Sequence, residues 1–243
     1  MLVRFAACVA VALACAAQAE PLQLYSGLAP PVSYISQQDH QAKGMAVDMM
    51  HELIKCSGDA AVISAHPWSR AIKLLDAHPL SGMFVADRTA EREPHFQWVG
   101  PIYRSSFNFY ALKSAKLKVR NFTELTQAGT IAVPAGWQAV KRAREQGLTD
   151  LLLVNDTSQL LPMLKQRRVK IIGSDELMLR SMGYQDHQLE RLVKFSPING
   201  YLAFNPQVPS QLVKRWQSCF GQMRRSGSYQ RIYLHWIGQM PEA

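Results

Sequence analysis

The chain has 243 residues, 48% of them hydrophobic, and a formal net charge of +9, and this length accommodates one large domain or two small ones. The basic residues are scattered, with the densest cluster at 165–168, so the charge favours solubility and attraction of anions over nucleic-acid binding. After residue 19 no stretch is continuously apolar over the roughly 18 residues that a membrane-spanning helix needs.

The first 19 residues are predicted to be a secretory signal peptide. Arg4 supplies a positive start, residues 5–16 are almost wholly apolar, and AQA at 17–19 is a small-residue cleavage site. A lipoprotein signal ending at Cys15 is the alternative, which the absence of the usual leucine three residues earlier disfavours. Removal of the signal takes away one positive charge and no acid, so the formal net charge falls from +9 to +8. We expect the mature chain to lie in the periplasm.

Strand-like and helix-like stretches alternate in the mature chain. In 44–58, Val47, Met50 and Ile54 share one helix face and Gly58 ends the segment. The stretch DRTAERE, 87–93, is expected to end a strand and begin a helix. In this half we expect strands at 22–27, 60–65, 80–86 and 107–113, and helices at 44–58 and 67–78.

The alternation restarts at residue 129. An amphipathic helix is expected at 208–227, because Val213, Trp216 and Phe220 recur at helical spacing. Residues 196–205 form a second long extended run. The other strands are expected at 129–136, 151–154 and 169–173, and the other helices at 137–147, 157–167 and 175–183.

Strands separated by helices indicate an α/β protein with largely parallel sheets. Two successive α/β sets, with extended runs near 104–112 and 197–205, predict two lobes joined by two crossings. We assign residues 20–105 and 200–243 to lobe 1 and residues 106–199 to lobe 2.

Two cysteines, Cys56 and Cys219, follow the predicted signal. An even pair in an exported, oxidising compartment favours one disulfide that closes a loop of most of the chain. The alternative is two buried thiols, because Cys219 lies on the apolar face of the helix at 208–227. Neither cysteine has a C-x-x-C neighbour, so no zinc site is expected.

Motifs of common enzymes are not found in the sequence. It contains no GxSxG, HExxH, P-loop or GxGxxG pattern, and its seven histidines form no ligand-spaced cluster. We therefore expect no metal site, no cofactor and no catalytic residues.

An ordered series of short motifs spans nearly the whole mature chain. They are PPVSY at 30–34, Gly44-Met45 with Asp48, Pro67-Trp68, Thr89-x-x-Arg92, the run 96–103, IAVPAGWQ at 131–138, RRVKIIGSDE at 167–176 and GYLAFN at 200–205. In this order they resemble the exported solute-binding proteins of the polar amino-acid uptake family (family 3), which have the type II periplasmic binding fold. The resemblance implies two lobes, each a mainly parallel sheet flanked by helices, that close on a small ligand by hinge motion.

The resemblance also assigns a role to the turn at 87–93. In the family, the arginine of Thr-x-x-Arg grips the ligand carboxylate, which here is Arg92, and a guanidinium can hold a carboxylate through two hydrogen bonds. Thr89 is expected to cap the helix that begins there. The alternative for Arg92 is a surface salt bridge with Glu91, Glu93 or Glu124.

Further ligand contacts are implied from both lobes. Gly136 and Trp137 open a helix whose amides would face the ligand, and Trp137 replaces the usual Thr or Ser, which leaves main-chain contact only. Asp175 matches the acid that accepts the ligand ammonium, with a role as helix N-cap as the alternative. Trp68 matches an apolar side chain that packs on the ligand, with core packing as the alternative. The remaining candidates are Tyr34 and Tyr103.

Asp87 is the main departure from the family. A serine often shares the ligand carboxylate with the arginine at this place. An acid would repel that carboxylate unless Arg88 neutralises it or it binds a cationic group. Val85 and Lys170 also replace a usual serine and aspartate. An α-amino acid is the ligand that the resemblance implies, and a different small polar or cationic ligand is its rival.

Three functions are compatible with these features. We favour a non-enzymatic periplasmic receptor, expected to be a monomer, that delivers an amino-acid-like solute to an ABC permease in the inner membrane. The second is an exported enzyme on the same fold, similar to cyclohexadienyl dehydratases, in which Asp87, Asp175 or Glu176 would serve as acid or base. The third is a stand-alone sensor or partner module.

Overall fold

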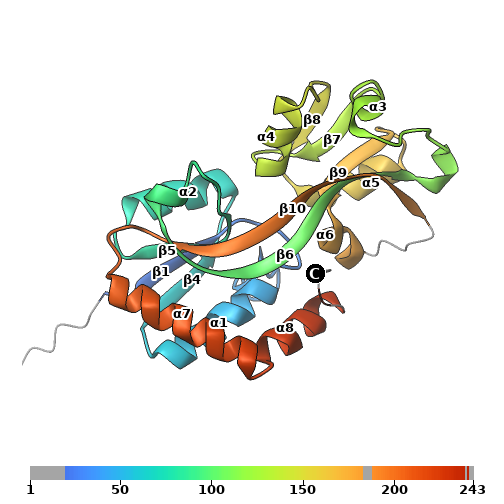
Figure 1. The fold of residues 1–243 in the computed structure, drawn as a ribbon. Helices are drawn as coiled ribbons and strands as arrows, with labels where there is room; N and C mark the ends of the chain where they lie inside the picture. The colour runs from blue at the N-terminus through green and yellow to red at the C-terminus, as the bar shows by residue number, and fades with distance from the viewer. Residues whose placement is uncertain (1–19, 183–187, 239, 241–243) are drawn as a thin grey trace, which may run out of the picture.

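The structure is a computed structural model that describes residues 20–182, 188–238 and 240, so the predicted signal peptide lies outside the described residues. Figure 1 shows two lobes connected by two long strands, β6 (Gln97–Leu112) and β10 (Leu189–Phe204). Each of these strands has 16 residues, and at about 3.3 Å per residue each spans roughly 50 Å, enough to cross both lobes.

The described strands of the two lobes form one sheet in the order β4-β1-β5-β10-β6-β9-β7-β8. The outer strands pair in parallel, whereas β10 is antiparallel to both β5 and β6, and β6 is antiparallel to β9. The predicted fold class, two mainly parallel α/β lobes with two crossings, is therefore confirmed. The outer strands are β1 (Leu22–Ser26), β4 (Ala61–Ala65) and β5 (Ser81–Asp87) in lobe 1, and β7 (Ile131–Pro134), β8 (Leu151–Val154) and β9 (Ile171–Asp175) in lobe 2. A separate small hairpin consists of β2 (Tyr34–Ile35) and β3 (Ala42–Lys43).

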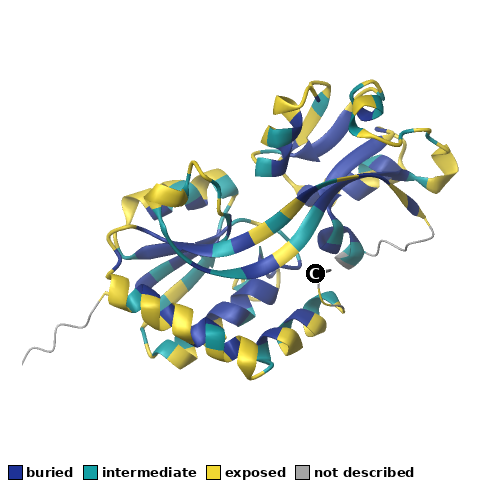
Figure 2. Ribbon diagram, in the orientation of Figure 1, coloured by how far each residue is buried: buried dark blue, intermediate teal, exposed yellow. Residues whose placement is uncertain are grey.

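Helices cover the faces of the sheet in each lobe, and Figure 2 shows buried strands beneath helices that expose their outer sides. In lobe 1, Phe204 of β10 packs edge-on against the buried Trp216, with ring centroids 5.5 Å apart. Lobe 1 has α1 (Met45–Ser57), α2 (Trp68–Ala77), α7 (Ser210–Arg225) and α8 (Ser228–Ile237). Lobe 2 has α3 (Phe122–Thr126), α4 (Gln138–Glu145), α5 (Leu160–Lys165) and α6 (Glu176–Ser181).

Helix α1 ends as its sequence predicts. Gly58 adopts a left-handed conformation with φ 73°, and its amide donates to the carbonyl of Ile54. Glycine adopts this conformation without a side-chain clash, which makes it the usual residue after the last turn of a helix. At the other predicted stop, Gly183 after α6 lies outside the described residues.

The predicted helix in DRTAERE is wrong. Residues 88–92 form a turn that leads into a single 3₁₀ helix, Glu93–His95. Thr89 still caps this turn, because its hydroxyl accepts a hydrogen bond from the amide of Arg92 at 3.3 Å. A longer helix does not fit, since β6 begins at Gln97.

Helix α8 was not predicted, although its sequence carries the signal. Tyr229, Ile232, Tyr233 and Trp236 recur at helical spacing, and Tyr229 and Tyr233 are buried. The indole of Trp236 donates to the carboxylate of Asp48 on α1 at 2.7 Å. This contact fastens α8 to lobe 1.

The predicted disulfide between Cys56 and Cys219 is present, with Cα atoms 5.8 Å apart. It joins α1 to α7 across 163 positions of sequence. Closing a long loop restricts the unfolded chain, so the bond is expected to stabilise lobe 1.

The lobe boundaries remain a proposal, to which the strand register lends support. The proposed boundaries fall after residue 105 in β6 and after residue 199 in β10, and Arg104 pairs with Asn199 while Tyr103 pairs with Gly200. Both boundaries therefore cut the paired strands at nearly the same level. Within the described residues, no helix is both long and apolar enough to span a bilayer.

Candidate ligand-binding cavity

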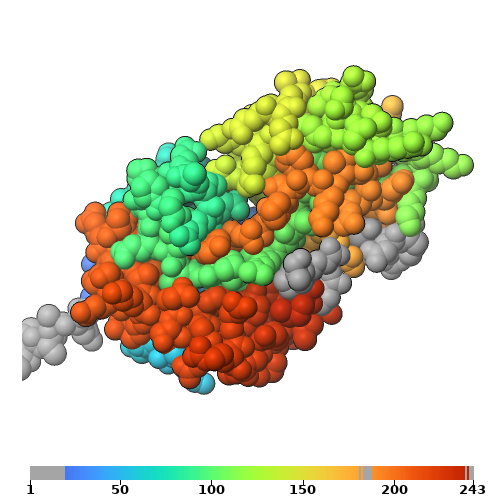
Figure 3. All heavy atoms as spheres, viewed as in Figure 1, coloured from blue at the N-terminus to red at the C-terminus, as the bar shows by residue number. Residues whose placement is uncertain are grey.

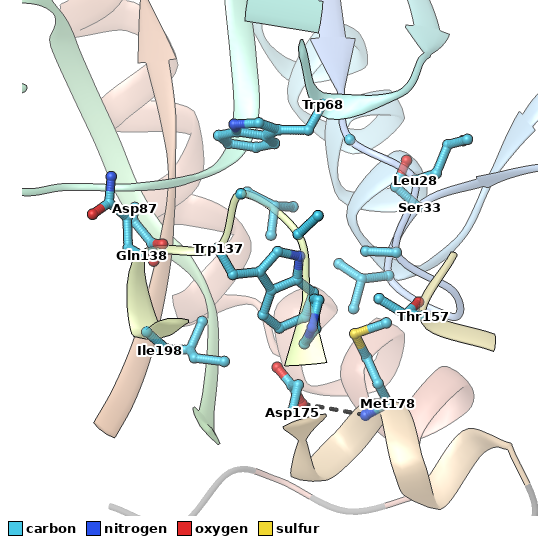
Figure 4. A pocket seen from close by; sticks show the side chains of 18 of the residues that line it. Leu28, Ser33, Trp68, Asp87, Trp137, Gln138, Thr157, Asp175, Met178 and Ile198 are labelled. Carbon is cyan, nitrogen blue, oxygen red and sulfur yellow. Dashed lines mark hydrogen bonds between the residues drawn. The ribbon is translucent and has the colours of Figure 1, made fainter. Parts of the chain in front are cut away.

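A cavity of about 590 Å³ lies between the lobes. Its walls come from the residues at or just after the carboxyl ends of β1, β4 and β5 in lobe 1 and of β7, β8 and β9 in lobe 2. This is where ligands bind in open α/β sheets, and the volume is in the usual range for small-molecule sites. Figure 4 shows the side chains directed into it.

Asp175, at the end of β9, is a buried carboxylate in the cavity wall. Its Oδ1 accepts from the Ser105 hydroxyl at 2.6 Å and from the amides of Leu177 and Met178, and its Oδ2 accepts from the Tyr103 hydroxyl at 2.8 Å. Burial raises the pKa of Asp175 to about 6, and these hydrogen bonds oppose the rise. Asp175 therefore both caps α6 and lines the cavity.

The hydroxyl of Tyr103 is held in turn by its surroundings. Its ring is stacked on Tyr233 of α8, with centroids 6.4 Å apart and planes 16° from parallel. Tyr233 donates its hydroxyl to the backbone carbonyl of Arg104. Burial raises the pKa of Tyr103, so this phenol remains a hydrogen-bond donor to Asp175 at neutral pH.

Asp87, at the end of β5, also lines the cavity. Within the described residues no donor is hydrogen-bonded to its carboxylate. Burial raises the pKa of Asp87, and the positive charges of Arg92 and Arg142 lower it in part. Two strand positions earlier, the cavity-lining Val85 has φ 62°, an unusual conformation for a β-branched residue.

Arg88 does not neutralise Asp87, which corrects one of the two possibilities read from the sequence. Its guanidinium makes two hydrogen bonds to Glu93, at 2.6 and 2.5 Å. It also lies 5.7 Å from the ring of Trp98 and 5.5 Å from that of Tyr201. Because these partners hold Arg88 outside the cavity lining, the cations that act on Asp87 are Arg92 and Arg142.

Arg92, the predicted carboxylate clamp, is not among the residues that line the cavity. Its guanidinium donates to the backbone carbonyl of Asp87 at 3.3 Å and lies 5.6 Å from the ring of Trp68. The alternative salt bridges of Arg92 are not formed either. In the described structure Glu93 pairs with Arg88, Glu91 with Lys141 at 3.0 Å, and Glu124 accepts from the amide of Arg120.

Two indoles from different lobes line the cavity, Trp68 at the start of α2 and Trp137 just before α4 (Figure 4). A Cβ at Gly27 would lie 2.9 Å from the Trp68 ring, so this glycine leaves room for the indole. The Trp137 ring packs on Phe107 with centroids 6.1 Å apart. Trp137 thus presents its side chain as well as its backbone to the cavity. Gly136, with φ 78°, makes the turn before it.

Besides Arg92, three more predicted residues lie outside the lining. Tyr34 packs edge-on against Trp236 at 6.3 Å, and Thr89 serves the turn described above. Glu176 accepts from Ser106 at 3.1 Å and pairs with Arg180 at 3.2 Å and with Arg191 at 3.4 Å. Its carboxylate is therefore engaged in a network beside the cavity.

Arg142 is the main cavity residue that sequence reasoning missed. It lies four residues after Gln138 on α4, and both line the cavity. Residues at this spacing share one helix face, so the position of Gln138 beside the predicted Gly136-Trp137 turn was an available signal. The other missed lining residues include Ser33, Asn155, Asp156, Thr157 and Met178.

The lobes touch through Lys141 of α4 and Glu91 of the turn at 88–92, with 3.0 Å between the charged atoms. In Figure 3 the segment near residue 90 adjoins the segment near residue 140. This ion pair therefore links the two lobes directly. Among the described residues, no three His, Cys, Asp or Glu side chains are grouped as a metal site would need.

The chain belongs to the bacterial extracellular solute-binding proteins, family 3, whose pattern matches residues 24–239. The family resemblance drawn from the sequence is thus confirmed, and with it a ligand-receptor function as a class. No curated protein matches the sequence.

Solved structures agree with this family in fold. A mutant of ArgBP from T. maritima superposes with a TM-score of 0.77 at 16% identity, covering 90% of this chain and 95% of that one. A histidine kinase sensor domain similar to periplasmic binding proteins gives 0.77 at 14% identity, covering 90% and 96%. An ancestral amino acid-binding protein, described as a precursor of cyclohexadienyl dehydratase, gives 0.76 at 16% identity, covering 89% and 95%.

Proposed function

We propose that the mature protein is a periplasmic receptor that binds a small amino-acid-like polar solute between its lobes and delivers it to an ABC permease. The observation that carries the proposal is the cavity of about 590 Å³ that both lobes line. Both lobes contribute lining residues, so a ligand inside it would contact both lobes at once. Such a ligand favours the closed state by its contacts with the second lobe.

The proposed contacts are Asp175 for a ligand ammonium group, Trp68 and Trp137 for its body, and the turn at Gly136 for a polar group. Asp175 has the support of geometry, since its donors hold the carboxylate in one orientation toward the cavity. Arg92 as a carboxylate clamp remains a prediction. In this structure its guanidinium contacts the Trp68 ring and the Asp87 backbone instead of the cavity.

A thermal-shift screen of the chain without residues 1–19 tests this function. Amino acids, polyamines, opines and small organic acids are each added at millimolar concentration. At 100 times the dissociation constant a ligand stabilises the folded state by about 2.7 kcal/mol, which for this size corresponds to a rise in Tm of roughly 5–10 °C. If no compound in these classes raises the Tm, the receptor function is wrong.

An enzyme is the second candidate, because a carboxyl group with a pKa of about 6 in a cavity can donate or accept a proton at neutral pH. Incubation of the protein with prephenate distinguishes the two functions. We expect no keto-acid product above the uncatalysed rate. Turnover that disappears in Asp175→Asn would establish the enzyme instead.

A further inference from the structure

The charges that line the cavity are unbalanced. Three carboxylates line it, those of Asp87, Asp156 and Asp175, against one guanidinium, that of Arg142. Asp156 caps the 3₁₀ helix at Thr157–Gln159 and is exposed. Asp87 and Asp175 are less exposed to solvent than Asp156. A charged group with little access to water requires a partner of opposite charge.

Asp175 has no positive partner among its hydrogen-bond donors. All four of these donors are neutral, being two hydroxyls and two backbone amides. Its Oδ2 accepts only the Tyr103 hydroxyl in the described structure, which leaves a lone pair of this oxygen for the ligand. The carboxylate is therefore set to receive a cation from inside the cavity.

The charge of Asp87 acts close to Arg92, the residue predicted to hold a ligand carboxylate. The Arg92 guanidinium is hydrogen-bonded to the backbone carbonyl of Asp87 itself, and the Asp87 side chain lines the cavity beside it. An incoming carboxylate would meet this negative charge at close range, in surroundings that screen charge poorly. Arg142 in the lining and Arg92 beside Asp87 oppose two of the three lining carboxylates, so one negative charge remains uncompensated.

Two indoles add aromatic surface to which an organic cation can bind. A tryptophan face attracts organic cations more strongly than the other aromatic side chains do. Trp68 and Trp137 supply such rings from opposite lobes, and both are directed into the cavity (Figure 4). Val85, Val154 and Ile198 add apolar wall.

We propose that the cavity selects an organic cation of amino-acid size that has an apolar body and lacks a carboxylate group. Its ammonium or guanidinium group binds Asp175, and its body lies against Trp68 and Trp137. Asp87 supplies the negative field that excludes carboxylates. This inference rests on the proposed receptor function and narrows the solute from amino-acid-like compounds in general to their amine counterparts.

Matched pairs of probes that differ only by a carboxylate test the proposal. Isothermal titration calorimetry of the mature protein compares agmatine with arginine, cadaverine with lysine, 2-phenylethylamine with phenylalanine and tryptamine with tryptophan. In every pair that binds, we expect the amine to bind roughly tenfold or more tighter than the amino acid. Amino acids that bind as tightly as their amines overturn the cation proposal and leave the receptor function intact. Absence of binding in both series overturns the receptor function together with the proposal.

The variant Asp87→Asn tests whether Asp87 causes the preference for amines over amino acids. Removal of its charge should weaken amine binding and strengthen amino-acid binding, so that the affinity ratio of each pair falls roughly tenfold. The matched control is Asp76→Asn, which removes the same charge from an exposed position of α2 outside the cavity lining and should leave the ratio unchanged. Equal Tm values of the two variants and the parent confirm that the fold is retained. An unchanged ratio in Asp87→Asn means that Asp87 does not exclude carboxylates.

Discussion

Each lobe places one aspartate in the cavity wall at the end of a strand, Asp87 of β5 and Asp175 of β9, and the surroundings of the two carboxylates differ. In lobe 2, four neutral donors orient the carboxylate of Asp175, and the residue also caps α6. In lobe 1, the carboxylate of Asp87 has no hydrogen-bond donor among the described residues and is acted on by the charges of Arg92 and Arg142. Hydrogen bonds hold a carboxylate in a fixed direction, whereas nearby cations favour its ionised form and offset its field without fixing its direction. Asp175 is thus suited to bind one group in a defined position, and Asp87 to set the sign of charge that the cavity accepts.

The largest expected effect comes from Asp175→Asn. Asparagine caps helices as well as aspartate does, so the α6 terminus is retained while the charge is lost. Removal of a buried charge partner should weaken the binding of a cationic probe by about 100-fold or more, as measured by calorimetry. A loss of less than about threefold would remove Asp175 from the binding site.

Arg92→Ala separates the predicted clamp from the cation proposal. If Arg92 binds the ligand carboxylate, arginine and lysine should lose about 100-fold or more in affinity. Agmatine should lose at most about tenfold, since it loses only the support that the guanidinium gives Trp68. Both series are measured by calorimetry on one preparation of the variant. An equal, small loss in both series would exclude the clamp.

The pH dependence of ligand affinity and of stability tests the environment of Asp175. Burial raises its pKa to about 6 in the free protein, so a proton competes with a cationic ligand below that pH. Affinity should fall by up to about tenfold per pH unit below pH about 6, and this slope should disappear in Asp175→Asn. The free energy of unfolding of the ligand-free protein should instead decrease as the pH rises. A raised acid pKa stabilises the fold below the usual pKa of aspartate, and this contribution is lost as the pH rises through about 6.

The smallest effect is expected at the contact between the lobes. Glu91→Gln removes the exposed ion pair with Lys141, which favours closure only weakly in water and salt. Affinity should fall by about threefold at low ionic strength and less at high salt. Glu93→Gln is the control, because Glu93 pairs with Arg88 within lobe 1 and should leave affinity unchanged. Equal effects of the two variants would show that the Lys141 contact does not assist closure.

Local patterns predicted much of the fold. Helical spacing and a terminal glycine located α1 and its end at Gly58, and the compartment favoured the bond between Cys56 and Cys219. Helix α8 was missed although Tyr229 and Tyr233 show the same spacing. The helix expected at DRTAERE was wrong because the composition suits a helix start, whereas the onset of β6 decides how many residues are available.

The candidate site could be predicted only in part. Six candidates named from the sequence line the cavity: Asp175, Trp68, Gly136, Trp137, Asp87 and Tyr103. Arg142 was not named, because its approach to Asp87 joins α4 of one lobe to β5 of the other. Neutralisation of Asp87 by Arg88 was one of two possibilities left open by the sequence. Successive residues of an extended chain point to opposite sides, and Arg88 bonds to Glu93 instead.

The sequence by itself determined the alternating elements, the family and the residue types that carry charge into the cavity. Periodicity, turn residues and ordered motifs are local properties, so one chain without coordinates displays them. Only the tertiary structure decided which charges meet. The electrostatic environment of Asp87 and Asp175 depends on burial and on partners up to 72 positions away, as with Tyr103 and Asp175, and no local pattern records those distances. The stretch at 87–93 therefore contributes Asp87 to the cavity and turns Arg88 away from it.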